Sequence, residues 1–183
     1  MLKLIQSMLI GMLRNEPTQT SQKLSSSTAL QSQSVSKLLG YDQRKLIKQI
    51  RRHEGERLKP YLCTSQKLTI GVGRNLDDRG ITREESQYLL MNDINAVEDG
   101  LVVKLPWFNE LDDVRKRVLI DMAFNLGLYG LLEFKNTLRY VSEGKYSQAS
   151  RNMLLSLWAD QVGQRAKTLS RMMETGEDPD FLC

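Results

Sequence analysis

A chain of 183 residues allows one globular domain with a short appendage, and an apolar content of 40% is enough to bury a core. Lys and Arg number 26 against 22 acidic residues, so the net charge of +4 favours anionic partners such as cell wall, lipopolysaccharide or nucleic acid without selecting among them. The composition excludes wholesale disorder, and the lack of a basic cluster interleaved with aromatic residues argues against nucleic-acid binding.

The cysteine and histidine content predicts neither a disulfide framework nor a metal site. Cys63 and Cys183 are the two cysteines, and we expect Cys183, the last residue, to be a solvated free thiol. His53 is the single histidine, and the cysteines do not have the spacing of metal ligands. We therefore expect no metal and no other cofactor.

Residues 1–14 form an apolar arm with helical spacing. Its stripe consists of Leu2, Ile5, Leu9 and Met12. The arm is too short to span a bilayer, polar residues interrupt it, and it has no small-residue cleavage site typical of a signal peptide. We expect it to lie against its own domain or a partner protein, and the less favoured interpretation is a weak membrane anchor.

Residues 15–39 are rich in Ser, Gln and Thr and include Pro17, so they predict a polar linker that cannot build a core. The globular domain is predicted to comprise residues 40–183. It begins with a helix over residues 43–54, with Asp42 as its N-cap and Gly55 as its end.

That first helix is predicted to be amphipathic and to end in a candidate catalytic acid. Ile47, Ile50 and Glu54 fall at positions i, i+3 and i+7, so the Glu54 carboxyl shares the face that we expect to pack inward. A carboxyl on an apolar face tends to keep its proton towards neutral pH, which suits a general acid. An isolated glutamate with this placement would more often be a surface residue at a frayed helix end.

Residues 60–73 alternate side chains around a short polar turn, which predicts a β-hairpin. The hairpin would fold Cys63 and Thr69 back towards the helix end that carries Glu54. After turns at residues 77–80, a capping box from Thr82 to Glu85 opens a helix that is expected to link two lobes and to end before Pro106.

The rest of the chain is predicted to be helical. Residues 111–126 are strongly periodic and are followed by Gly127 as a C-cap. Two or three further helices are expected over residues 131–141, 147–158 and 162–174. The predicted fold class is α+β, with a small β-hairpin lobe packed on a larger helical lobe and a cleft between them.

The order and spacing of three residues carry a family resemblance. Eight residues separate Glu54 from Cys63, and five separate Cys63 from Thr69. With residues 53–61 (HEGERLKPY) and 68–73 (LTIGVG), the chain resembles the phage T4-type lysozymes, marked by Glu, eight residues, Asp or Cys, five residues, Thr. Further similar segments are 121–127 (DMAFNLG), 134–139 (FKNTLR) and 157–158 (LW), so the resemblance extends over roughly residues 43–180.

The resemblance implies a muramidase that cuts the β-1,4 bond between N-acetylmuramic acid and N-acetylglucosamine. It implies that Glu54 is the general acid and that Cys63 and Thr69 handle an attacking water, with inversion. A free thiol has a pKa of about 8.5, so Cys63 needs help to become a thiolate at neutral pH, and a nearby cation such as Arg74 could supply it. Without the resemblance, Cys63 would be a small half-buried packing residue.

The resemblance also implies substrate contacts and a supporting residue. The positions that match family substrate contacts are Asn75, Phe124, Thr137 and Asn152, and Arg165 matches an arginine that pairs with the catalytic glutamate. Three positions depart from the family pattern: Arg74 replaces a histidine, Asn75 stands where an apolar residue can occur, and Thr137 departs conservatively, because it keeps a hydroxyl. Phe124 would offer its ring to a sugar face, although ordinary core packing is the simpler interpretation of an isolated phenylalanine.

Bacterial peptidoglycan is therefore the expected partner, together with a phage tail or baseplate protein through residues 1–14. The enzyme would reside in the host cytoplasm before release to the periplasm, or on the virion. Two alternatives stay open: a lytic transglycosylase, which can work with one glutamate, and a virion component that only binds peptidoglycan.

Overall fold

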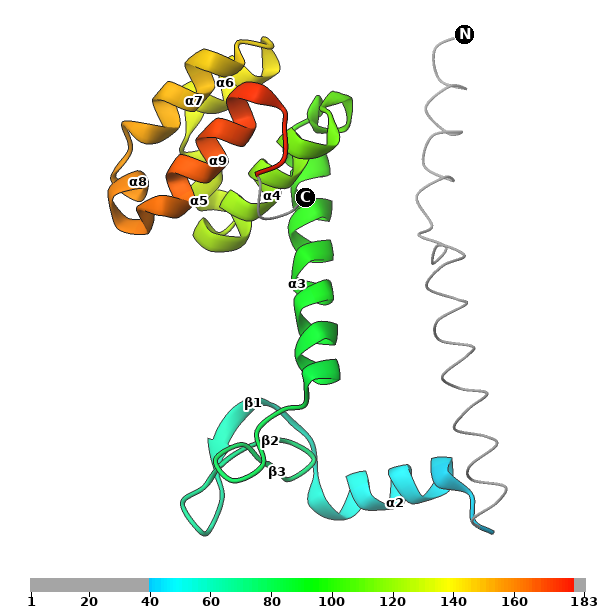
Figure 1. The fold of residues 1–183 in the computed structure, drawn as a ribbon. Coiled ribbons are helices and arrows are strands. Elements are labelled where there is room, and N and C mark those ends of the chain that lie inside the picture. Colours follow the sequence, from blue (N-terminus) through cyan, green and yellow to red (C-terminus); the bar gives the residue numbers. More distant parts are fainter. Residues whose placement is uncertain (1–39, 180–183) are drawn as a thin grey trace, which may run out of the picture. The chain divides into compact units, whose positions relative to one another are not determined.

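The computed structural model describes residues 40–179, and the chain divides into two units that meet in sequence between Gly80 and Ile81 (Figure 1). Each unit is described by itself. The predicted arm, the linker over residues 15–39 and Cys183 lie outside the described residues. The described part has helices and a small antiparallel sheet, so the α+β class is confirmed. The predicted cleft between lobes stays a prediction.

The first unit begins with α2 (Gln43–Glu54), whose two ends lie where the sequence predicts them. The Asp42 carboxylate accepts hydrogen bonds from the backbone N–H groups of Arg44 (3.0 Å) and Lys45 (3.3 Å), as an N-cap does. Gly55 ends the helix with φ of 73°, a conformation that favours glycine.

A three-stranded antiparallel sheet follows, in the order β1 (Arg57–Leu62), β2 (Leu68–Gly71), β3 (Arg74–Asn75). The predicted hairpin is therefore confirmed, and β3 extends it by a short strand. Tyr61 lies opposite Thr69, and Thr69 lies opposite Asn75. Residues directly opposite in antiparallel strands share a face, so these three side chains form one row across the sheet.

The burial of α2 differs from the prediction. Ile47, Ile50 and Glu54 do share one side of the helix, but no residue of α2 is buried, and Ile47 and Ile50 are 48% and 44% exposed. The expectation that this face packs inward is wrong in this structure. The reason is that the apolar core begins only at Leu101, and Thr69 is the one fully buried residue within residues 40–80.

The second unit begins with α3 (Arg83–Lys104), and both bonds of the predicted capping box are present. The Thr82 hydroxyl accepts from the Glu85 N–H at 3.2 Å, and the Thr82 N–H donates to the Glu85 carboxylate at 2.7 Å. A 3₁₀ turn, η1 (Phe108–Glu110), leads to α4 (Asp113–Leu126), which ends at Gly127. It begins two residues later than predicted because Asp112 is its N-cap.

Five short helices complete the second unit, where the sequence analysis expected two or three. They are α5 (Leu128–Leu132), α6 (Lys135–Ser142), α7 (Tyr146–Leu154), α8 (Leu157–Val162) and α9 (Gln164–Thr175). Two of the breaks fall at Gly144 and Gly163, which have φ of 69° and 54°. A third falls at Ser156, whose hydroxyl accepts from the Ala159 N–H and so starts a new helix.

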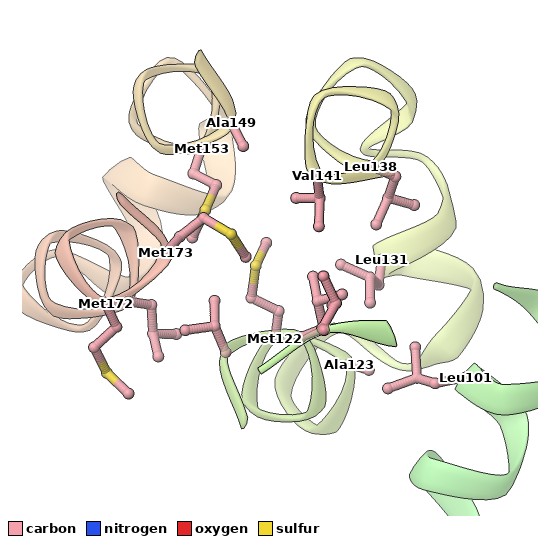
Figure 2. Close-up of a cluster of buried hydrophobic side chains, with 14 of the residues drawn as sticks. Leu101, Met122, Ala123, Leu131, Leu138, Val141, Ala149, Met153, Met172 and Met173 are labelled. Carbon is pink, nitrogen blue, oxygen red and sulfur yellow. The ribbon is translucent and has the colours of Figure 1, made fainter. Parts of the chain in front are cut away.

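The apolar core lies in the second unit and draws on most of its helices. Figure 2 shows Met122 of α4 in the middle of this cluster, with Leu131, Val141 and Met173 around it. Helix α9 packs against α4, α7 and α8, which closes the bundle around α4. No helix within residues 40–179 is long and apolar enough to cross a membrane.

Candidate active site

Glu54 is exposed at the end of α2 and lies beside the turn that joins β2 to β3. A Cβ atom placed on Gly73 in that turn would be 3.9 Å from Oε2 of Glu54. The helix end and the β2–β3 turn therefore come together at this carboxylate, and the predicted approach of Cys63 and Thr69 to Glu54 stays a prediction. The carboxylate meets the turn after β2, whereas Cys63 and Thr69 lie at the opposite end of that strand.

The tight turn between β1 and β2 brings Cys63 and Thr69 together. The Cys63 N–H donates to the Lys67 carbonyl at 3.0 Å, and the Gln66 N–H donates to the Cys63 carbonyl at 2.9 Å. Thr69 is 3% exposed, and its hydroxyl donates to the same Lys67 carbonyl at 3.0 Å. Cys63 carries a free, half-buried thiol, so its sulfur is available for chemistry.

Hydrogen bonds in this turn favour the thiolate form of Cys63. The backbone N–H of Lys67, followed by that of Ser65 and the Thr69 hydroxyl, lowers the pKa of the thiol, and partial burial opposes this effect. A thiolate accepts hydrogen bonds more strongly than a thiol, so donors aimed at the sulfur stabilise the charged form. The Thr69 hydroxyl has one proton, so it favours the thiolate when it turns from the Lys67 carbonyl to the sulfur.

Lys67 is a cation in this turn, whereas Arg74, the example given in the sequence analysis, is not among the groups that lower the pKa of Cys63. The Arg74 side chain donates to the Gly80 carbonyl at 2.8 Å. Lys67 forms an ion pair with Asp78 at 2.9 Å, and this hydrogen bond is the main cause that raises the pKa of Lys67, with a smaller contribution from the charge of Cys63. The hydrogen bonds, and not this cation, dominate the shift at the thiol.

We expect Cys63 to react with iodoacetamide at lower pH than an ordinary thiol. Only the thiolate reacts, so a lowered pKa moves the rise of the alkylation rate to below the usual midpoint of about 8.5. Thr69→Val removes a hydroxyl that favours the thiolate, so it should shift the midpoint upward. Both proteins should carry Cys183→Ser, so that Cys63 is the only cysteine that can be alkylated. If the alkylation rates of both proteins rose with the same pH midpoint of about 8.5, this account would be contradicted.

Asn75 uses its side-chain amide within its own turn. Nδ2 donates to Oδ2 of Asp78 at 2.8 Å, and the Asp78 N–H donates to Oδ1 of Asn75 at 2.9 Å. Asn75 therefore holds the turn after β3 in shape, next to Thr69 on the same face of the sheet. Its contact with substrate stays a prediction.

In the second unit, the structure joins Thr137 and Asn152. The Thr137 hydroxyl donates to Oδ1 of Asn152 at 2.8 Å, and Thr137 is 0% exposed. Asn152 lines a surface hollow together with Phe134, Asn136 and Leu155. Because Thr137 has no exposed surface, it fixes the orientation of the Asn152 amide, and Asn152 is the member of the pair that a ligand can reach.

Phe124 lies near the end of α4 and is 43% exposed, which rules out ordinary core packing. An exposed ring can lie against the apolar face of a sugar. The neighbouring Asn125 is held in place because the Trp158 indole N–H donates to its Oδ1 at 2.8 Å.

Arg165 pairs with an acid that the sequence analysis did not identify. Its Nε donates to Oδ1 of Asp121 at 2.8 Å, which ties α9 to α4. Asp121 is an acidic residue beside the apolar stripe of a predicted helix, a weak signal in the sequence. The pairing of Arg165 with Glu54 stays a prediction. Among residues 40–179, no group of three His, Cys, Asp or Glu side chains could hold a metal ion.

The chain is similar to known proteins over most of its length. The phage lysozyme family model matches residues 51–174, which include Glu54, Cys63 and Thr69. The endolysin of Salmonella phage P22 is 30% identical over 74% of this chain and 86% of its own length. A probable T4-type lysozyme of Dictyostelium discoideum is 29% identical over 67% of this chain and 89% of its own length.

A third relative has a different setting. The pre-baseplate central spike protein Gp5 of Enterobacteria phage T4 is 24% identical over 72% of this chain, which corresponds to 28% of Gp5. The family match covers well over half of the residues and coincides with the residues that carry the resemblance. The chain therefore belongs to the phage lysozyme family, of the T4 type.

Proposed function

We propose that this peptidoglycan hydrolase is a muramidase that cleaves the β-1,4 bond between N-acetylmuramic acid and N-acetylglucosamine. The observation that supports it most is the Glu54 carboxyl, exposed at a helix end beside the β2–β3 turn, in a domain where Cys63 and Thr69 have the family spacing. An exposed carboxyl can reach the glycosidic oxygen of a long polymer.

In this mechanism Glu54 donates its proton to the leaving oxygen as the bond to the anomeric carbon breaks. A water attacks that carbon from the opposite side and loses a proton. Cys63, as a thiolate, accepts that proton or orients the water, and Thr69 holds the thiolate through its hydroxyl. The phenyl ring of Phe124 and the amide of Asn152 are proposed to bind sugars.

Substitution of Cys63 tests the role of the thiolate. Cys63→Asp should keep or raise activity, because aspartate is ionised at neutral pH and can accept from the water. Cys63→Ala should lower turnover at least about tenfold, at the low end of what proton transfer contributes. Alkylation should inactivate the native enzyme and the Cys183→Ser variant alike. Equal turnover of Cys63→Ala and the native protein would reduce Cys63 to a packing residue.

The activity itself is tested on purified peptidoglycan. The purified chain should clear a suspension of Gram-negative peptidoglycan and give a band of lysis in a zymogram at its own mass. Absence of clearing by a folded protein would overturn the proposal and leave a component that only binds peptidoglycan.

The relatives include both an endolysin and a baseplate spike protein, so the enzyme is proposed to act either in host lysis or on the virion. The arm over residues 1–14, with its apolar stripe, is proposed to attach the enzyme to a tail or baseplate protein. In the lysis role, the enzyme would move from the host cytoplasm to the periplasm.

Deletion of residues 1–37 should leave a folded enzyme with turnover within about twofold of the full chain, since the proposed catalytic residues all follow the deletion. Mass spectrometry of purified particles should find the full chain and not the truncated one. Unfolding of the truncated protein, or equal amounts of both proteins in particles, would show that the arm is not an attachment device.

A further inference from the structure

Five cationic side chains lie along one side of α2. All five are exposed, and no acidic residue lies between Gln43 and His53. The five residues are Arg44, Lys45, Lys48, Arg51 and Arg52. Arg51 forms an ion pair with Glu56 at 3.2 Å, and the other four have no ion pair with another residue among those described, 40–179. We call this set the basic face of α2.

The positive charge of the protein is concentrated around this helix. Residues 40–80 contain ten Lys and Arg against five Asp and Glu, a net charge of +5, whereas the whole chain carries +4. The other 142 residues together therefore carry −1. A local excess of this kind attracts an anionic surface over a distance of about one Debye length, roughly 8 Å at physiological salt.

Three cations of the basic face, Lys45, Lys48 and Arg52, are turned well away from the catalytic carboxyl, whereas Arg44 and Arg51 lie about 80° and 60° around the helix from it. At 3.6 residues per turn, Lys45, Lys48 and Arg52 fall within an arc of about 60°, whereas Glu54 is turned about 160° from Arg52. Ile47 and Ile50 share the side of Glu54. A surface that holds Lys45, Lys48 and Arg52 would therefore leave Glu54 turned away from it, free to meet a polymer.

We propose that the basic face of α2 docks on a bilayer surface rich in anionic phospholipid head groups, and so holds the enzyme at the membrane while Glu54 faces away from it. The cations extend over about 12 Å along the helix. α2 contains no Phe, Tyr or Trp on which bases could stack, which disfavours single-stranded nucleic acid. Clustered Lys and Arg are the residues that bind anionic lipid surfaces.

Sedimentation of the full-length protein with lipid vesicles tests the proposal. Vesicles with equal parts of phosphatidylglycerol and phosphatidylethanolamine should bind it, with binding that falls as NaCl rises, and phosphatidylcholine vesicles should not. The triple variant Lys45→Gln, Lys48→Gln, Arg52→Gln should bind at least about tenfold more weakly. The control Arg83→Gln, Lys104→Gln, Lys167→Gln loses the same charge elsewhere and should bind within about twofold of the native chain.

Equal weakening in both triple variants would overturn the proposal, because general charge and not α2 would then govern binding. No binding to phosphatidylglycerol vesicles, or salt-independent binding, would overturn it as well. If the α2 variant lost binding to a DNA duplex but kept vesicle binding, the face would be a nucleic-acid surface instead. Hydrolysis of soluble peptidoglycan fragments should be unchanged in both variants, which separates this test from that of the muramidase activity.

Discussion

Glu54→Gln should abolish clearing of peptidoglycan and leave the fold intact. The amide has nearly the shape of the carboxyl but no proton to give to the leaving oxygen, and general acid catalysis contributes roughly 10²- to 10⁴-fold. Because Glu54 is exposed and no residue of α2 is buried, the substitution should change the free energy of unfolding little. The measurement is the initial rate of turbidity loss, together with a urea unfolding curve.

Glu56→Gln provides the matched control, since Glu56 is a second exposed glutamate two residues along the chain. Its carboxylate pairs with Arg51 at 3.2 Å, and an exposed ion pair of this kind contributes about 0–1 kcal/mol. Its activity should stay within about twofold of the native rate, since an exposed ion pair has no part in proton transfer. If Glu54→Gln kept more than about a tenth of the native rate, Glu54 would be rejected as the acid. The loss of rate would then be smaller than the roughly 10²- to 10⁴-fold contribution expected of a general acid.

Trp158→Ala should destabilise the second unit by about 3–5 kcal/mol, the range for truncating a buried aromatic residue. Trp158 is 4% exposed, and its ring meets that of Phe134 edge to face at 6.0 Å between centroids. The substitution also removes the indole N–H that donates to Asn125, next to Phe124. We therefore expect a lower midpoint of urea unfolding and, at permissive temperature, weaker binding of peptidoglycan.

Trp158→Phe helps to separate these two effects, because it keeps one six-membered aromatic ring in the core and loses the N–H donor together with the rest of the indole. It should cost about 1–3 kcal/mol, since Oδ1 of Asn125 is left without that donor. A loss as large as that of the alanine variant would show that the hydrogen bond, and not the packing, dominates this position.

The features that the sequence predicted best are those that depend on residues close together in the chain, namely helix ends and the β-hairpin. The caps at Asp42, Gly55, Thr82 and Gly127 were all predicted, because each depends on a side chain or a glycine within four residues of the helix end. The pairing of β1 with β2 followed from alternation and a polar turn. These features do not depend on distant parts of the chain.

Burial and partner choice could not be predicted in the same way. The spacing of Ile47, Ile50 and Glu54 predicts an amphipathic helix, but it does not show whether another element covers that side. Thr137 was identified as a substrate contact from its position in the family pattern, yet only the structure shows that it is buried and holds Asn152. The ion pair of Arg165 with Asp121 joins residues 44 positions apart, which no local rule predicts.

The sugar ends that the purified protein releases from peptidoglycan test the central claim most directly. A muramidase adds water across the bond, so mass spectrometry after borohydride treatment should find N-acetylmuramic acid at reduced ends of the fragments. Glu54→Gln should release none. Fragments that end in 1,6-anhydro-N-acetylmuramic acid, which borohydride cannot reduce, would contradict hydrolysis and identify a lytic transglycosylase instead.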